Sequence, residues 1–220
     1  MIQFSHYKPN NPRTKIRPRR LRKSYKNQLM MSEWLVEVPE DLAAKWLMIL
    51  CPEGRRNLVI AAHGSTKVFS KSGKQMKSFP SNLPGGNRQQ RKKVAYTILD
   101  CIYSEAAGTF YILDMMVWDG FQYYDCETDF RLAWLTSKIM ENPELAVKSR
   151  LNPYCFRSLP FYPCSQESIQ EALNSPMPFP DQLDGLLIYH KEVVTISTLP
   201  CLDNYHRFTI CPGEPHWLVG

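Results

Sequence analysis

Residues 46–63 read Trp-Leu-Met-Ile-Leu-Cys-Pro-Glu-Gly-Arg-Arg-Asn-Leu-Val-Ile-Ala-Ala-His, and this stretch decides the fold. The apolar residues 46–51 predict a strand, and Pro52-Glu53-Gly54 predicts a turn. A second strand is predicted at 57–63, where the central apolar run suits a sheet that is buried on both faces. Two strands joined by so short a turn predict the start of an antiparallel meander.

Further elements follow on either side of this stretch. More strands are predicted at 66–70, 96–103, 109–118, 153–163 and 186–190. Helices are predicted at 128–142, with Thr128 as N-cap, and at 165–174, with Ser165 as N-cap. Residues 27–35 predict a short helix or a lead-in segment, and 78–93 predict a long loop. The predicted fold class is α+β, with mostly antiparallel twisted sheets and a few helices.

The positive charge is concentrated at the N-terminal end. The chain has 27 Lys and Arg and 21 Asp and Glu, which gives a net charge of +6. Nine of the basic residues precede Glu33 and no acidic residue does, so the rest of the chain has 18 basic against 21 acidic residues. A basic arm ahead of a nearly neutral domain suggests contact with a polyanion or an import receptor, and a solvated tail is the equal alternative.

Composition also limits the compartment and the chemistry. No apolar run approaches the roughly 20 residues that a membrane helix needs, and the N-terminus has no apolar signal core, so we expect neither a membrane span nor secretion. The seven cysteines contain no Cys-x-x-Cys pair. We therefore expect reduced, buried thiols rather than a disulfide framework, and no zinc site.

Three segments follow one another in an order that points to a known catalytic frame. They are Cys51-Pro52-Glu53-Gly54, then residues 97–103 (Thr-Ile-Leu-Asp-Cys-Ile-Tyr), then Asp184-Gly185-Leu186-Leu187-Ile188. Their order and strand contexts resemble the superfamily of capping enzymes and ligases, in which the first reads Lys-x-Asp-Gly, the second ends Asp-Gly-Glu and the third is Asp-Gly followed by two apolar residues.

The reacting groups of that superfamily are replaced. Cys51 stands in place of the lysine, Glu53 in place of the aspartate and Ile102 in place of the glutamate. A covalent nucleotidyl-lysine needs an amine nucleophile with a carboxylate nearby. The sequence therefore predicts a nucleotide- or cap-binding module with no catalytic residue, no metal site and no cofactor, and it disfavours an active guanylyltransferase or ligase.

Longer strings narrow the resemblance to one family. They are residues 27–35 (Asn-Gln-Leu-Met-Met-Ser-Glu-Trp-Leu), 63–67 (His-Gly-Ser-Thr-Lys), 83–88 (Leu-Pro-Gly-Gly-Asn-Arg), 96–103, 123–131 and 184–191. Together they resemble the snurportin family over about residues 27–191. The resemblance implies a fold like that of the mRNA capping enzyme nucleotidyltransferases. It also implies binding of the 2,2,7-trimethylguanosine cap of spliceosomal U snRNA, without catalysis.

The same resemblance implies a cellular role. The family acts as an adaptor for the nuclear import of snRNPs, so the chain is expected to shuttle between nucleus and cytoplasm. The implied partners are trimethylguanosine-capped U snRNA, the import receptor importin β and a nuclear export receptor, with no membrane. Residues 1–26 contain prolines and do not show the family's arginine-rich helix, so the sequence leaves open whether this arm binds importin β, another receptor or RNA.

The resemblance also implies the residues of the cap site. Trp34 is expected near the methylated amine, with Met31 and Ser32 beside it. Cys51 is expected on the pocket floor and Ile102 as an apolar wall. Arg56 and Lys71 match basic residues that face the cap phosphates. These residue types suit the ligand, because a flat cationic base favours aromatic rings and a triphosphate favours Lys and Arg.

Each of these residues has an ordinary alternative. Trp34 can be a core tryptophan, Cys51 a packing residue, Arg56 the partner of a nearby acid and Lys71 a solvated turn residue. A basic cluster in the predicted loop can follow the RNA past the cap or can simply be solvated. Its members are Arg88, Arg91, Lys92 and Lys93.

The C-terminal end departs from the family pattern. We expect a basic disordered arm at 1–26, a cap-binding domain at 27–191 and a divergent C-terminal segment at 192–220, for which completion of the domain is one option. Leu218-Val219-Gly220 aligns with the family's Leu-Val-Gly, after which the family carries a tryptophan that stacks on the base. Trp217 is the candidate substitute, although it comes three positions early. The alternative function is therefore a cap-incompetent regulatory isoform or a partner-binding protein on the same fold.

Overall fold

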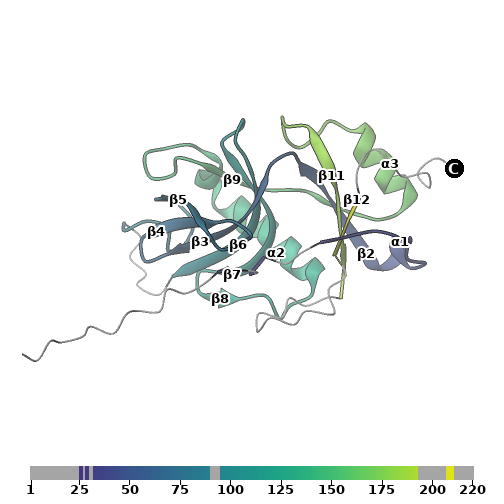
Figure 1. Cartoon of the computed structure of the whole chain (residues 1–220), viewed down its shortest axis with the longest axis horizontal. Helices are drawn as coiled ribbons and strands as arrows, with labels where there is room; N and C mark the ends of the chain where they lie inside the picture. The colour runs from purple at the N-terminus through teal and green to yellow at the C-terminus, as the bar shows by residue number, and fades with distance from the viewer. Residues whose placement is uncertain (1–24, 27, 30–31, 90–94, 193–206, 211–220) are drawn as a thin grey trace, which may run out of the picture.

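Two β-sheets joined by the stretch 46–62 form the framework of the molecule (Figure 1). The computed structural model describes residues 25–26, 28–29, 32–89, 95–192 and 207–210. The strand β2 (Trp46–Pro52) belongs to one sheet, and β3 (Arg55–Ala62) belongs to the other. The expected meander is therefore wrong at its first step, because β2 pairs with β10 and β11 rather than with β3.

Gly54 marks the point where the chain crosses between the sheets. A Cβ at this position would lie 2.6 Å from Cγ2 of Ile102 and 2.7 Å from the carbonyl oxygen of Tyr103. Glycine is therefore needed for the close approach of the crossing segment to β6. As a result, Cys51 at the end of one sheet and Arg56 at the start of the other lie on either side of this crossing.

The larger sheet has seven strands. Their order is β5 (Gln75–Phe79), β4 (Ser65–Phe69), β3, β6 (Tyr96–Ser104), β7 (Thr109–Trp118) and β8 (Phe121–Gln122). The seventh strand, β9 (Cys155–Ser158), pairs with β7 in parallel, whereas the other neighbours are antiparallel.

The smaller sheet has five strands. Their order is β1 (Glu33–Trp34), β12 (Arg207–Ile210), β11 (Leu183–His190), β2 and β10 (Phe161–Pro163). All seven residues of β2 are buried, so this strand is central to the core. The pairing of β1 with β12 is parallel and joins opposite ends of the described chain.

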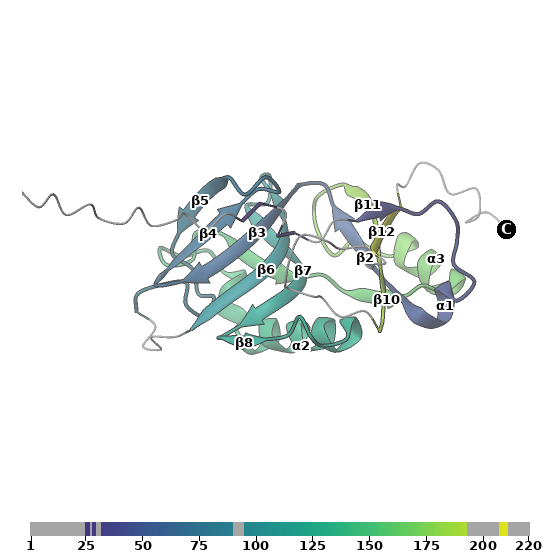
Figure 2. The same cartoon turned by 60° about the horizontal axis from the view of Figure 1, so that its bottom comes forward.

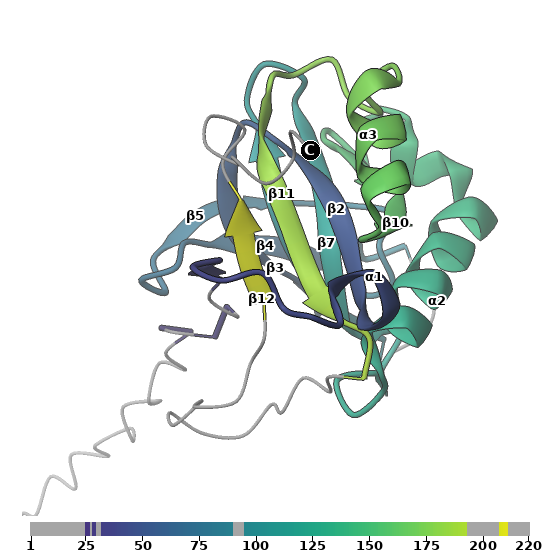
Figure 3. The same ribbon diagram turned by 90° about the vertical axis from the view of Figure 1, so that its right-hand side faces the viewer.

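Helices are few. They are α1 (Leu42–Lys45), α2 (Thr128–Glu141), α3 (Gln166–Asn174) and a 3₁₀ turn at Pro143–Ala146. The apolar side of α3 packs in the same cluster as β2, and Figure 3 shows the helix alongside β2 and β10. Figure 2 shows α2 lying next to the larger sheet. No helix within the described ranges is long and apolar enough to cross a membrane.

The predicted fold class is confirmed, and most of the predicted strands and helices are present. Ser165 caps α3 as predicted, because its hydroxyl accepts a hydrogen bond from the backbone N–H of Ser168 at 3.2 Å. Thr128 is not the N-cap of α2. Glu127 holds that position, and the Thr128 hydroxyl instead accepts a hydrogen bond from Arg131 at 3.3 Å.

Other expectations need correction. The predicted strand at 153–163 is two strands, β9 and β10, which belong to different sheets. The strand β5 was not predicted, because its sequence Gln-Met-Lys-Ser-Phe is mostly polar. Residues 33–34 form a short strand rather than part of a helix. Most of the arm, 1–24, lies outside the described residues, as do 193–206 and 211–220 of the C-terminal segment.

Candidate functional site

One face of the larger sheet carries two of the predicted site residues, Arg56 and Ile102, and we call it the cleft face. It is formed by alternate residues of two paired strands whose register has no shift. They are Arg56, Leu58, Ile60 and Ala62 of β3, opposite Ile102, Asp100, Ile98 and Tyr96 of β6. Since side chains alternate across a strand, these eight residues share one face. Ile102 also belongs to the same core cluster as Cys51 of the smaller sheet.

Arg56 holds Asp100 at the inner end of this face. Its Nε donates to Oδ1 of Asp100 at 2.9 Å, and its Nη2 donates to Oδ2, so the pair is bidentate. Burial lowers the pKa of Arg56, but the charge of Asp100 and the hydrogen bonds to it raise the pKa by more, so the guanidinium stays charged. The Arg56 side chain is 23% exposed, whereas Asp100 is 2% exposed.

The third nitrogen of Arg56 is available to a ligand. Nη1 makes no hydrogen bond to any residue within the described ranges, and the side chain is not sealed from solvent. The alternative role, pairing with a nearby acid, is thus observed, and it does not use up the donors. A guanidinium anchored on one edge and open on another is suited to bind an anionic oxygen.

A second ion pair lies directly beside the first. Asp114 of β7 is paired in register with Asp100 of β6, so two carboxylates face each other across neighbouring strands. Arg131 of α2 neutralises the second one, with Nε and Nη2 each 3.0 Å from the carboxylate oxygens of Asp114. Two like charges in this position would repel each other, so both arginines are needed to hold them.

Cys51 and Ile102 belong to one buried apolar cluster beside Arg56, and we call these two residues the apolar floor. Both side chains are buried and lie in one cluster with Leu113 and Tyr111 of β7. The Cys51 thiol donates a weak hydrogen bond to the carbonyl oxygen of Ile49 at 3.8 Å. At positions 51 and 102 the structure therefore offers a thiol and a methyl-bearing side chain rather than an amine and a carboxylate.

Trp34 lies at the edge of the smaller sheet. It is the second residue of β1, and its side chain is 63% exposed. The alternative role of a core tryptophan is wrong, because the indole is mostly in solvent. Ser32 is half-buried next to this strand. The other two predicted contacts on the cap base, Met31 and Trp217, lie outside the described residues.

Lys71 lies in the turn between β4 and β5, where it is exposed. This turn packs closely on the N-terminal lead-in, because a Cβ on Gly73 would lie 2.5 Å from the backbone nitrogen of Lys26. The structure thus brings Cys51, Arg56 and Ile102 together and places Trp34 and Lys71 on separate elements. Sequence reasoning missed Asp100, although an acid inside an apolar strand was a signal that it needs a buried partner.

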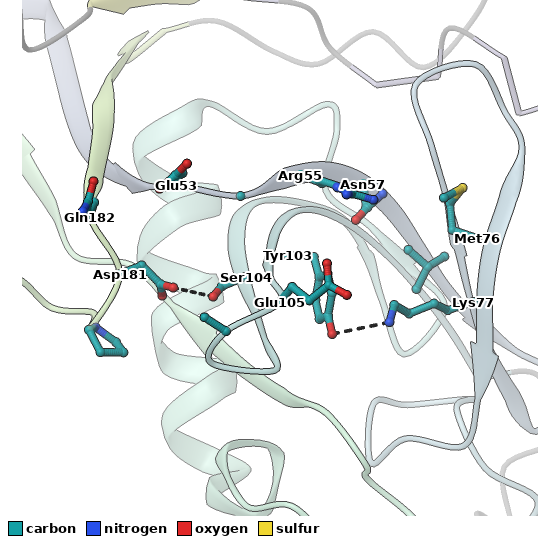
Figure 4. A pocket seen from close by; sticks show the side chains of 14 residues that line it. Glu53, Arg55, Asn57, Met76, Lys77, Tyr103, Ser104, Glu105, Asp181 and Gln182 are labelled. Atoms are coloured by element: carbon teal, nitrogen blue, oxygen red, sulfur yellow. Dashed lines mark hydrogen bonds between the residues drawn. The ribbon is translucent and has the colours of Figure 1, made fainter.

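A hollow of about 650 Å³ on the opposite face of the larger sheet contains none of the predicted site residues (Figure 4). Its charged lining includes Glu53, Glu105 and Asp181. Asp181 accepts hydrogen bonds from Ser104 at 2.5 Å and from Tyr111 at 3.2 Å. Burial, followed by the charge of Asp181, raises the pKa of Tyr111 to about 12.

Two cations, Arg55 and Lys77, also line this hollow, and Lys77 packs against two tyrosine rings. Nζ of Lys77 lies 4.6 Å from the ring centre of Tyr103 and 4.9 Å from that of Tyr154. It also donates hydrogen bonds of 3.4 Å to both hydroxyl groups. The lining of this hollow is therefore of mixed charge, with three carboxylates and two cations. Among the described residues, no group of three His, Cys, Asp or Glu is arranged to hold a metal ion.

Solved structures with a similar fold share little sequence with the chain. Two of them, titled Pmar-Lig_Pre and Pmar-Lig_PreS3, match with TM-scores of 0.54 and 0.53 at 11% and 10% identity, and each match covers 83% of this chain and 46% of that chain. The ligase domain of M. tuberculosis LigD matches with a TM-score of 0.45 at 14% identity, over 77% of this chain and 54% of that one. The chain spans about half the length of these structures. The likeness to the two Pmar-Lig structures concerns the fold alone and agrees with the predicted fold class.

Comparison with protein families identifies a closer group. The family described as "Snurportin1, m3G cap-binding domain" matches residues 28–202, which is most of the chain. The matched range contains β1, both ion pairs, the apolar floor and the β4–β5 turn. The chain therefore belongs to the snurportin family and carries its m3G cap-binding domain.

Proposed function

We propose that the chain binds the 2,2,7-trimethylguanosine cap of U snRNA without catalysing nucleotidyl transfer, and that it serves as an adaptor for snRNP nuclear import. The observation that carries the proposal is the family match over residues 28–202. The geometry supports it in three ways, one for each part of the ligand.

The methylated base needs an aromatic surface and an apolar wall. The exposed indole of Trp34 offers the surface, because a cationic purine ring gains from stacking and from cation–π attraction. The base methyl groups cannot donate hydrogen bonds, so they favour the apolar floor of Cys51 and Ile102. Recognition of this base thus depends more on shape and stacking than on hydrogen bonds.

The triphosphate needs fixed positive charge. Arg56 supplies it from a defined position, since Asp100 fixes two of its nitrogens and Nη1 has no hydrogen-bond partner among the described residues. Lys71, on the exposed turn, supplies a second and more mobile charge. The cap phosphates are expected between these two cations.

The absence of catalysis is argued from the residues at the two reactive positions. A nucleotidyl-enzyme intermediate on lysine requires an amine, and Cys51 has none. The Cys51 thiol is buried and hydrogen-bonded to a carbonyl, so it is not presented as a replacement nucleophile. Incubation with radiolabelled GTP and Mg²⁺ should leave no acid-stable label on the protein, and a stoichiometric label would overturn this part of the proposal.

Tryptophan fluorescence tests cap binding directly. Titration with a trimethylguanosine-cap dinucleotide should quench the emission strongly, and the 7-methylguanosine dinucleotide should quench it weakly. Trp34→Ala should weaken binding by about tenfold or more, in line with roughly 1–3 kcal/mol for one stacked base. Phe121→Ala is the matched control, because it removes an aromatic ring that is 68% exposed on a different strand.

Two results would contradict the assignment. Equal affinity for both dinucleotides would remove the specificity, and unchanged affinity in Trp34→Ala would remove Trp34 from the site. Absence of binding in protein that melts cooperatively would favour the regulatory or partner-binding alternative. The adaptor role is tested separately, by asking whether the protein stimulates nuclear import of a trimethylguanosine-capped RNA in permeabilised cells and not of a 7-methylguanosine-capped one.

A further inference from the structure

A second hollow on the cleft face extends away from the candidate cap site. It has a volume of about 1130 Å³ and lies over the outer halves of β3, β4 and β6. Its floor is formed by Ile60, Ala62 and Ile98, which are half-buried and share the face that Arg56 begins. We call this hollow the lysine groove.

The groove lies on the same face of the sheet as Arg56. From Arg56 to Ala62 the strand advances six residues, or roughly 20 Å at about 3.3 Å per residue. The register between β3 and β6 is unbroken over this length, so the face is not interrupted by a bulge. Between Arg56 and the groove, Leu58 and Asp100 are buried, and Leu58 packs with Leu29 of the N-terminal lead-in, so RNA attached to a cap at Arg56 would cross over this cluster to reach the groove.

The charges of the groove are of one sign. Its described lining includes Lys67 and Lys74, both exposed, and contains no Asp or Glu. Neither lysine forms an ion pair within the described ranges, so both ammonium groups are available. Arg88 extends the positive charge at the far end, where its side chain packs on the turn at Gly64. The hollow on the opposite face differs in being mixed in charge, since three carboxylates line it together with Arg55 and Lys77.

Aromatic rings flank the same lysines. Tyr25 and Tyr96 line the groove and are only half-buried. The ring of Tyr25 packs against that of Phe69, with ring centres 4.5 Å apart. Rings that alternate with cations on an apolar floor are the arrangement by which proteins hold single-stranded nucleic acid without reading its sequence. A polyanion without bases, such as an acidic peptide, would use the lysines but not the rings.

From these observations we propose that the lysine groove binds the single-stranded RNA that follows the cap, with Lys67 and Lys74 on its phosphates and Tyr96 against a base. The proposal rests on the proposed cap-binding function, because the cap fixes where the RNA enters. It assigns to the domain an affinity for the body of the RNA in addition to its affinity for the cap.

The test compares three ligands on three proteins. The ligands are the trimethylguanosine-cap dinucleotide, a ten-nucleotide unstructured RNA with this cap, and the same RNA without a cap. The proteins are wild type, Lys67→Ala/Lys74→Ala, and the control Lys45→Ala/Lys148→Ala. The control removes two exposed lysines from outside the groove, one on α1 and one beside the β6–β7 turn.

The proposal predicts a defined pattern. Wild type should bind the capped RNA about tenfold more tightly than the dinucleotide, in keeping with the energy of one or two stacked bases and phosphate contacts. The groove variant should lose this advantage to within about twofold while its affinity for the dinucleotide stays unchanged, and the control should keep it. The logarithm of the affinity ratio between capped RNA and dinucleotide, plotted against the logarithm of the salt concentration, should have a slope near about −1.4. Two lysine–phosphate contacts are expected, and each contact to a single strand contributes about −0.7. Tyr96→Ala should reduce the advantage several-fold without changing that slope.

Contrary results identify which proposal fails. Equal binding of the capped RNA and the dinucleotide by wild type, or equal loss in the control, would overturn the groove. Competition by poly-glutamate as effective as that by the uncapped RNA would also overturn it, because it would indicate a general acidic partner. Failure of the dinucleotide to bind, with the uncapped RNA still bound and released by Lys67→Ala/Lys74→Ala, would overturn the cap function and leave the groove.

Discussion

Arg56 and Arg131 each bind an aspartate of the larger sheet through Nε and Nη2. The two arginines differ in what surrounds the third guanidinium nitrogen, Nη1. In Arg131, Nη1 donates to the carbonyl oxygen of Cys126 at 2.5 Å, and the side chain is 1% exposed. In Arg56, Nη1 has no partner in the part of the chain that the structure describes. We call the Arg131–Asp114 pair closed, because all three nitrogens of its arginine donate hydrogen bonds, and the Arg56–Asp100 pair open, because Nη1 donates none to the described residues. The comparison shows that one nitrogen without a hydrogen-bond partner distinguishes a candidate ligand-binding arginine from a structural one.

Breaking the closed pair should have the largest effect. Arg131→Met leaves Asp114 buried and unpaired next to Asp100, and loss of one partner of a buried pair costs about 3–5 kcal/mol. Urea denaturation should show this loss in the free energy of unfolding. Arg131→Met/Asp114→Leu should regain a large part of it, because an apolar pair leaves no buried charge. Equal stability of Arg131→Met and wild type would show that the pair is not structural.

Breaking the open pair should affect both folding and binding, because Arg56→Met also leaves Asp100 buried without its arginine partner. Arg56→Met removes a charge-assisted hydrogen bond to phosphate, worth about 1.5–3 kcal/mol, so the affinity for the cap dinucleotide should fall by roughly 10- to 100-fold. Fluorescence titration measures this. Arg56→Lys is the sharper variant, because one ammonium cannot hold Asp100 in two places and also reach a phosphate. We expect it to fold nearly as well as wild type and to bind weakly; wild-type affinity in Arg56→Lys would argue against a bidentate anchor with a free third donor.

Replacing each aspartate by asparagine should cause the smallest change in cap affinity, and the two variants should differ from each other. In Asp100→Asn the amide keeps the shape but no longer offsets the charge of Arg56, so attraction for the cap phosphates should rise by about twofold and its salt dependence should steepen. Asp114→Asn should leave cap affinity unchanged, since Arg131 is closed to solvent. Titrations at low and high salt measure both. A similar change in both variants would mean that the two pairs act as one charged unit.

Much of the fold could be predicted from local pattern. The strands β2, β6 and β7 are long apolar runs, and α3 begins after Ser165, a residue type that is common at helix N-caps. The edge strand β5 could not be found this way, because an edge strand needs few apolar residues. Local pattern also cannot assign strands to sheets, which is why β2 and β3 were expected to pair and why β9 and β10 were expected as one strand.

The candidate site was predictable in its residues but not in their partners. The family resemblance supplied Arg56 and Cys51 as site residues, and the structure places them together with Ile102. The partner of Arg56 is 44 positions away, and no local rule connects them. Arg131 carried even less signal, since an arginine in a helix is ordinarily exposed and here it occupies the buried side. Only the tertiary structure determines which arginine has partners for all its nitrogens and which keeps one for a ligand.

The parallel pairing of β1 with β12 has a consequence for biosynthesis. The backbone of Trp34 is paired with that of Thr209, so β1 can pair only with a strand that is synthesised 175 residues later. Closing so long a loop carries a large entropic cost, and such contacts form late in folding. On the ribosome, β1 has no partner until residues 207–210 emerge, whereas β3, β4 and β5 can already pair with one another. A nascent chain therefore acquires its tryptophan-bearing edge last, and a truncated translation product stopping before β12 would fold its larger sheet while lacking that edge.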